Sequence, residues 1–208
     1  MFIMLDVFRM KSKSEQAVEW AKERGVIRPK ELAELGIHPT YIQHLVSTGE
    51  FRKVGRGLYV AATHEPTEAH TLVQAVKSQT GGVICLLSAL MFHQLGTQAP
   101  YNVWLAVPYG TRHSTADYPP RRIIVMREPA YEAGIEYHDV EGMKLPVYSV
   151  AKTVADCFKF RNKVGLDVAL EALREALRDR RCHRSEIHAF AKLLRVEKVI
   201  MPYLEALT

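Results

Sequence analysis

The chain has 208 residues, of which 48% are hydrophobic and 25% charged, and its net charge of +5 gives a pI near 9.1. No run approaches the roughly 18 to 20 consecutive apolar residues that cross a bilayer, so we expect a soluble protein and not a membrane-spanning one. The three cysteines are odd in number and far apart, which argues against a disulfide framework or a zinc site and favours a reducing cytoplasm.

The mild basic charge suits a polyanionic partner without requiring one, and the length allows one large domain or two small ones. Two unequal domains fit better. The first ten residues, MFIMLDVFRM, contain Asp6 and Arg9 and lack both a signal-peptide core and a small-residue cleavage site. We therefore expect a packing extension there.

Two short helices are predicted after this extension. Ser12 and Ser14 are both candidate N-caps of the first helix, Glu15 completes a capping box with Ser12, and Gly25 ends the helix. The second helix covers residues 30–35 and is opened by the preceding Arg-Pro pair, since proline tolerates the first helical position.

A third helix is predicted to follow Pro39. Ile42, Leu45 and Val46 recur at the spacing that places them on one helical face. The opposite face carries polar side chains with both donors and acceptors, which suits the reading of base edges better than a solvated face of Glu and Lys would. These side chains belong to Thr40, Gln43, His44 and Ser47.

Residues 51–60 alternate apolar and basic residues around Gly55-Arg56-Gly57, which predicts a hairpin with cationic tips. Arg52, Lys53 and Arg56 stand on it with no acidic residue among them, a composition suited to phosphate contacts. Three short helices followed by a hairpin is the element order of a winged helix-turn-helix.

Two other functions are compatible with the elements of this region. Winged-helix folds also serve as protein adaptors, so the fold alone does not establish DNA binding, but the cationic hairpin favours it. RNA binding is less favoured, because RNA modules usually expose stacking aromatic rings and only Tyr41 and Tyr59 are candidates.

Residues 61–69 form the predicted linker, and Thr67 is the candidate cap of a helix over 70–78. The second domain then continues with helical and extended segments. Its predicted elements are an apolar helix-like run over 83–95, buried strands over 102–107 and 123–126, and a hairpin of 135–140 with 143–148.

From Ser149 the chain is predicted to be helical again. Ser149 caps residues 150–160, Ser185 opens a helix, and a last helix covers 198–207. Between them, residues 165–178 carry one apolar stripe, made of Leu166, Ala169, Leu170, Leu173 and Leu177. The fold class is therefore α+β, with an N-terminal winged helix-turn-helix and a larger mixed α/β domain that has a small sheet and a helical C-terminal end.

Five stretches in this order resemble the AbiEi antitoxins of bacterial abortive-infection systems, which are type IV toxin–antitoxin systems. They are VIRPKELAELGI, the hairpin VGRGLYV, GVICLLSALMFHQLGTQ, VWLAVP and VYSVAKTVADCFKFRNKVGLDVALEALREAL. The similarity covers nearly the whole chain after the first dozen residues, and the block from Tyr148 to Leu177 is specific and not merely compositional.

This resemblance implies a DNA-binding transcriptional repressor and antitoxin that binds operator repeats in double-stranded promoter DNA and represses its own operon. The implied domains are 13–62 for DNA binding and 67–208 for antitoxin activity, with a nucleotidyltransferase-like toxin as the partner. The alternative is a protein-interaction module that neutralises such a toxin without DNA. No catalytic residue, cofactor or metal is implied. The expected DNA contacts are Arg28, Thr40, Tyr41, Gln43, His44, Arg52, Lys53 and Arg56.

Two patterns resemble enzyme sites, but the residues around them do not favour catalysis. Ser149 and Lys152 have the S-x-x-K spacing of acyl-transfer enzymes, but no K-T-G strand or G-x-S-x-G motif accompanies them, so Ser149 is expected to be a helix cap. Asp139, Glu141 and Lys144 resemble a metal-nuclease set, yet the carboxylates flank a turn glycine, where solvated acidic residues are common. The histidines show no metal-ligand spacing.

A second basic cluster lies beyond the long helix and consists of Arg178, Arg180, Arg181 and Arg184. Such a cluster can interact with the negative carboxyl end of the helix. It can equally contact DNA or another partner, and the sequence leaves both possibilities open.

Overall fold

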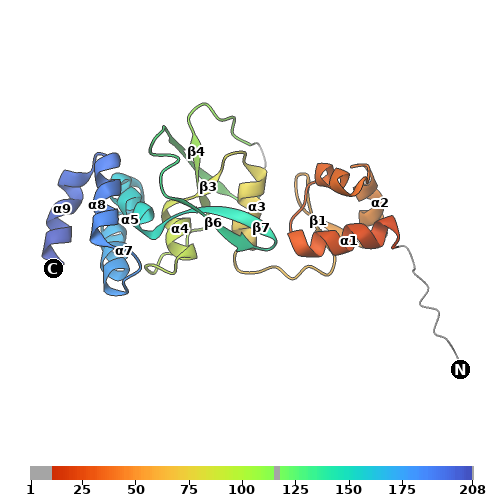
Figure 1. Ribbon diagram of the computed structural model, residues 1–208, viewed down its shortest axis with the longest axis horizontal. Helices are drawn as coiled ribbons and strands as arrows, with labels where there is room; N and C mark the ends of the chain where they lie inside the picture. Colours follow the sequence, from red (N-terminus) through yellow and green to blue (C-terminus); the bar gives the residue numbers. More distant parts are fainter. Residues whose placement is uncertain (1–10, 115–117, 208) are drawn as a thin grey trace, which may run out of the picture. The chain divides into compact units, whose positions relative to one another are not determined.

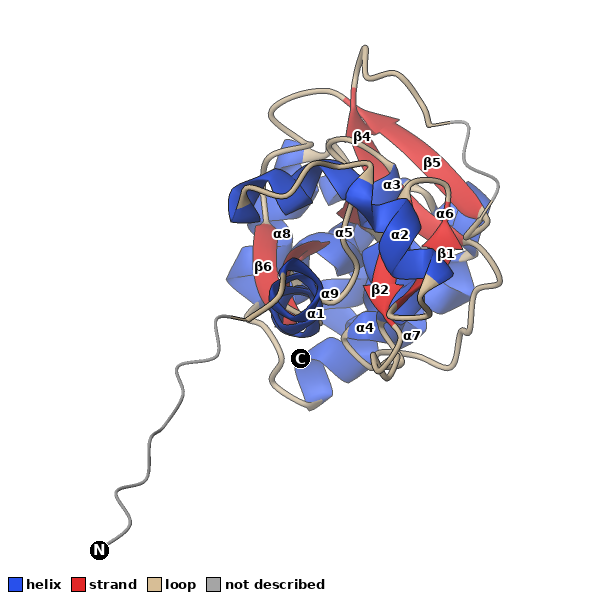
Figure 2. Ribbon diagram, turned by 90° about the vertical axis from the view of Figure 1, so that its right-hand side faces the viewer, coloured by secondary structure: helices blue, strands red, loops and turns tan. Residues whose placement is uncertain are grey.

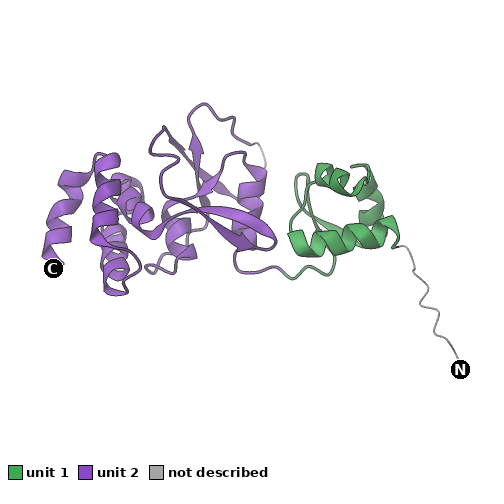
Figure 3. Ribbon diagram, in the orientation of Figure 1, with its two compact units in different colours: residues 1–65 green, residues 66–208 purple. Residues whose placement is uncertain are grey.

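The computed structural model describes residues 11–114 and 118–207, so the expected packing extension over residues 1–10 lies outside the described residues. The chain divides into two compact units between Glu65 and Pro66, inside the stretch predicted as a linker (Figure 3). Helices and sheets occur together, which makes the fold a mixed α+β one. No helix in the described part of the chain has the length and apolarity needed to cross a bilayer.

The N-terminal unit consists of three helical segments and a hairpin (Figure 1). Its elements are α1 Lys13–Arg24, the 3₁₀ helix η1 Pro29–Leu35, α2 Tyr41–Ser47, β1 Phe51–Gly55 and β2 Leu58–Ala61. The predicted capping box is confirmed, because the Ser12 hydroxyl accepts from the Glu15 amide at 3.1 Å and the Glu15 carboxylate accepts from the Ser12 amide at 2.8 Å. Ser14 instead donates to Glu50 at 2.5 Å.

The core of this unit draws on every element. Its buried side chains include Ala17, Leu32, Ile42, Leu45, Phe51 and Tyr59. The structure adds one strand-like contact that the sequence does not predict. Ile27 and Tyr59 exchange backbone hydrogen bonds of 2.8 and 2.9 Å. The segment that precedes η1 is therefore held against the hairpin.

The C-terminal unit has a five-stranded mixed sheet, in the order β5-β4-β3-β7-β6, followed by a group of helices (Figures 1 and 2). Its elements are α3 His70–Ser78, β3 Val83–Ile84, α4 Leu86–Phe92, β4 Val103–Pro108, β5 Arg121–Met126, β6 Ile135–Val140, β7 Met143–Tyr148, α5 Val150–Lys159, α6 Arg161–Val164, α7 Leu166–Arg178, α8 Arg184–Leu193 and α9 Glu197–Ala206.

Both faces of the sheet are covered. On β4, Trp104 and Ala106 belong to the main core with α4 and α5, while the alternating Leu105 and Val107 are also buried. Since successive side chains of a strand point to opposite faces, the second set needs its own cover, and α3 packs against β4 and β7. The helix α5 lies at the centre of the C-terminal helices and packs against α7, α8 and α9.

Four predicted details of this unit are wrong, and two of them concern its first elements. The apolar run 83–95 is not one helix: its first residues form β3, and Cys85 is extended before α4 begins. Because β3 joins β4 and β7, this short strand lies at the centre of the sheet. Thr67 does not cap α3, where Ala69 holds the N-cap position, and the Thr67 hydroxyl donates to Glu141 at 2.8 Å.

The long helix α7 is rotated relative to its predicted face. Leu166 is predicted to point inward, yet it is 37% exposed, and the buried positions are Val168, Ala169, Ala172, Leu173 and Ala176. The face that meets α5 is thus rich in alanine, which permits close helix packing. At α8 the N-cap is His183 and not the predicted Ser185.

Candidate nucleic-acid interface

The exposed face of α2 follows directly from its buried face. Ile42 and Leu45 are 1% and 0% exposed and anchor the helix in the N-terminal core. Four neighbouring polar residues are consequently turned to solvent: Thr40, Gln43, His44 and Ser47. Tyr41, the fifth candidate of this segment, is half-buried and packs against the core, so only part of its ring is accessible.

Local contacts orient several of these side chains. The His38 Nδ1 atom lies 2.8 Å from the Thr40 hydroxyl, and the rings of Tyr41 and His44 are 5.1 Å apart between centroids. Gln43 is exposed and, within residues 11–114 and 118–207, has no hydrogen-bonded partner for its side chain. It therefore has its full set of donors and acceptors available to a ligand.

His38 was not among the predicted contact residues, although it positions one of them. The signal is present in the sequence as His38-Pro39-Thr40. A residue before proline is biased towards an extended backbone, and a polar side chain there can bond two residues further on. This pattern identifies His38 as an orienting residue for Thr40.

The hairpin presents its cations outward. In the antiparallel register, Arg52 pairs with Val60 and Lys53 with Tyr59, and an irregularity follows before Gly55. Arg52, Lys53 and Arg56 are all exposed. Arg52 also donates to the backbone carbonyl of His64 at 3.0 Å, a contact that holds its guanidinium beside the end of the N-terminal unit.

Arg28 is half-buried and follows the residue that pairs with β2. Its amide donates to Glu31 at 3.1 Å, which fixes the start of η1. The backbone bonds between Ile27 and Tyr59 thus bring Arg28 close to the hairpin, although the two are far apart in sequence.

The predicted contact residues all belong to the N-terminal unit, in which α2 packs against β1. This arrangement can present a polar helix face and a cationic hairpin to one ligand. It offers little to single-stranded RNA, because Tyr59 is only 6% exposed and Tyr41 is half-buried, whereas base stacking needs open rings.

The alternative enzyme-like sets are not supported. Ser149 accepts from the Lys152 amide at 3.3 Å as a helix cap, and Lys152 is completely buried in an ion pair with Asp156 at 2.6 Å. A lysine held in this way cannot reach a substrate. The burial of Lys152 was not foreseen from the sequence.

The two carboxylates of the nuclease-like set have separate partners. Asp139 pairs with Lys144 at 2.7 Å on the surface, while Glu141 lies 2.7 Å from His70 Nδ1 and accepts from Thr67. Burial alone would raise the pKa of Glu141, but these hydrogen bonds outweigh it and lower that pKa. The carboxylate therefore ties α3 to the turn between β6 and β7.

Comparison with known families places the candidate interface in context. Residues 15–62 match the family of transcriptional regulators described as AbiEi antitoxins. This match confirms the resemblance over α1 to β2, while the resemblance of the later block from Tyr148 to Leu177 stays a prediction. No curated protein matches the sequence.

The fold as a whole is similar to a solved structure, the crystal structure of the RV2827C protein from Mycobacterium tuberculosis. The TM-score is 0.56 at 14% sequence identity, and the alignment covers 96% of this chain and 81% of that chain. At this sequence identity the similarity shows a shared fold and does not indicate an activity.

Proposed function

We propose that this chain is a DNA-binding transcriptional repressor and antitoxin of a type IV toxin–antitoxin system, without catalytic activity, acting in the cytoplasm. In this proposal residues 13–62 are a winged helix-turn-helix that binds operator repeats, and residues 67–208 are an antitoxin-type α/β domain. One observation carries it: the segment that matches the AbiEi regulators contains both an exposed polar helix and an acid-free cationic hairpin.

The proposed contacts divide into two groups with different tasks. Thr40, Gln43 and His44, with the exposed part of Tyr41, read base edges in the major groove. Arg28, Arg52, Lys53 and Arg56 bind phosphates, which supplies affinity but little sequence preference. Because the two tasks are separable, substitutions in the two groups should have different consequences.

The test compares Gln43→Ala with Arg56→Ala on operator DNA and on random duplex, with binding measured over a range of salt concentrations. Arg56→Ala should weaken binding to both DNAs and reduce the slope of log affinity against log salt by about one. Gln43→Ala should lower affinity for the operator by roughly 1–3 kcal/mol and leave random DNA nearly unaffected.

A matched control removes a cation elsewhere in the same unit. Lys22 is exposed on α1, so Lys22→Ala changes the net charge as Arg56→Ala does without touching the hairpin. If Lys22→Ala weakens binding as much as Arg56→Ala, net charge and not the hairpin governs affinity. Equal losses on operator and random DNA for both Gln43→Ala and Arg56→Ala would contradict the assignment.

A second candidate function is a protein-interaction module that neutralises a nucleotidyltransferase-like toxin independently of DNA. It is favoured by one observation, namely that the residues from Pro66 onward form a compact unit with its own core. Co-expression of residues 67–208 with the toxin gene would distinguish the two. Restored growth would place antitoxicity in this unit. If only the full chain restores growth, antitoxicity depends on the N-terminal unit and is linked to DNA binding.

A further inference from the structure

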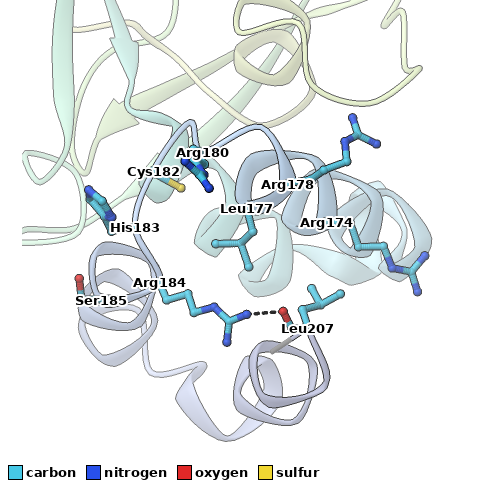
Figure 4. A pocket seen from close by; sticks show the side chains of 9 residues that line it. All are labelled: Arg174, Leu177, Arg178, Arg180, Cys182, His183, Arg184, Ser185 and Leu207. Carbon is cyan, nitrogen blue, oxygen red and sulfur yellow. Dashed lines mark hydrogen bonds between the residues drawn. The ribbon is translucent and has the colours of Figure 1, made fainter.

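A cavity of about 780 Å³ lies in the C-terminal unit among α7, α8 and the end of α9 (Figure 4). Four arginines line it, and none of its described lining residues is acidic. They are Arg174, Arg178, Arg180 and Arg184. The predicted second basic cluster is thus largely part of a concave site and not of a flat surface.

Two of these arginines already have structural partners. Arg184 donates to the carbonyl oxygens of Leu204, at 3.1 Å, and Leu207, so it holds the last turn of α9. The predicted interaction with a helix carboxyl end is therefore present for Arg184, but on α9 and not on α7. Arg178 makes two hydrogen bonds to Asp179, at 2.8 and 3.1 Å.

Arg174 and Arg180 differ from this pair. Both are exposed, and neither side chain has a hydrogen-bond or ion-pair partner in the described part of the chain. Arg180 also has a left-handed backbone with a φ of 51°, a conformation that costs free energy for any residue with a Cβ and that glycine adopts freely. The chain thus keeps an arginine where glycine would be the least strained choice.

The floor of the cavity is less polar than its rim. In Figure 4, Leu177 points into the space between α7 and Leu207, whereas the side chains of Arg174 and Arg178 are directed outward. Burial raises the pKa of Cys182 to about 11, so this lining thiol is neutral. Uncharged side chains and exposed cations thus line the same space.

We propose that this cavity binds a small ligand with two or more phosphate groups, with Arg180 as its main contact and Arg174 at the rim. The guanidinium group matches phosphate oxygens in a bidentate geometry, and the volume lies within the range of small-molecule sites. The apolar floor suits the uncharged part of a nucleotide. A concave site bounded by three helices fits a compact ligand better than a linear duplex backbone. This site is independent of DNA binding by the N-terminal unit.

The experiment titrates the full-length protein with ATP and with inorganic tripolyphosphate by isothermal calorimetry. Arg180→Gly should weaken binding of both probes about tenfold or more, since a charged hydrogen bond to phosphate is lost. Arg195→Gly is the matched control, because Arg195 is also exposed and left-handed, with a φ of 58°, but does not line the cavity. Both variants relieve the same backbone strain, so both should melt at or above the wild-type temperature.

The possible outcomes separate the proposal from its rivals. Loss of affinity in Arg180→Gly with unchanged affinity in Arg195→Gly supports it, and tighter binding of ATP than of tripolyphosphate would add that the floor holds the nucleoside. Equal losses in both variants would reduce the effect to net charge and overturn it. Absence of binding by both probes at millimolar concentration, or an Arg180-dependent affinity for a short DNA duplex alone, would also overturn it.

Discussion

The two units of the chain differ in whether their cores contain buried polar side chains. Within residues 11–65, no charged or amide side chain is buried, so the N-terminal core is apolar apart from the hydroxyl of Tyr59. The C-terminal unit buries polar groups at several positions, including Gln74, Gln79, His93, Lys152 and Asp156. Substitutions of the proposed contact residues in the first unit should therefore change binding, whereas substitutions of these buried polar residues in the second unit should change folding.

The buried ion pair is the extreme case of this difference. Lys152 and Asp156 are both 0% exposed, and the Lys152 ammonium also lies 4.0 Å from the centre of the Tyr148 ring. The second carboxylate oxygen of Asp156 has no hydrogen-bond partner among the described residues. Burial raises the pKa of Asp156 to about 6, although Lys152 opposes the shift. Removing both charges from water costs free energy, and the attraction between the two charges opposes that cost.

The largest predicted effect follows from breaking this pair. Lys152→Met should lower the free energy of unfolding of the C-terminal unit by about 3–5 kcal/mol, because it leaves a buried carboxylate without its cation. The double variant Lys152→Met/Asp156→Leu should recover most of the loss in unfolding free energy, since two apolar side chains leave no buried charge unpaired. Chemical denaturation measures both, and a double variant as unstable as the single one would contradict this account.

Two adjacent residues of α2, one buried and one exposed, test this comparison within the N-terminal unit. Ile42→Ala should lower the free energy of unfolding by about 2–4 kcal/mol, because Ile42 is 1% exposed and its loss leaves a cavity. Gln43→Ala should change stability by less than about 0.5 kcal/mol, as expected for an exposed position. Thermal melts of isolated residues 11–65 would report both values, and a comparable loss in Gln43→Ala would show that its side chain serves the fold.

A smaller effect is expected at His93, through pH. Its ring Nε2 donates to the Tyr148 carbonyl at 2.7 Å, and burial lowers the pKa of His93 from its ordinary value of 6.5. The unfolded chain therefore binds a proton at a higher pH than the folded one, and the stability due to neutral His93 is present above about pH 6.5 and lost as pH falls.

The variant His93→Gln keeps a donor but does not titrate. Its difference in unfolding free energy from the wild type should shrink between pH 7.5 and pH 5.5, because only the wild type must charge a buried ring. Denaturant melts at several pH values provide the measurement. A difference that stays constant across this range would show that His93 does not contribute to the pH dependence.

Much of the local structure was predictable because it depends on residues close in sequence. The predicted hairpin over 135–140 and 143–148 has the bounds of β6 and β7, with Glu141-Gly142 as its turn. The caps at Ser12 and Ser149 are confirmed for the same reason, since each cap bonds an amide three residues away. The solvent-facing positions of α2 and the cationic hairpin follow from periodicity alone.

The sequence by itself thus determined the helix starts at Ser12 and Ser149, the turn at Glu141-Gly142 and the polar and apolar faces of short elements such as α2, because these are set by contacts within a few residues. Only the tertiary structure decided which face of α7 meets α5, that residues 83–84 form a central strand, and that Lys152 is buried. It also decided that Arg184 holds α9 while Arg180 lines a cavity. Each of these depends on a partner distant in the chain, and a local pattern of charge or apolarity carries no information about that partner.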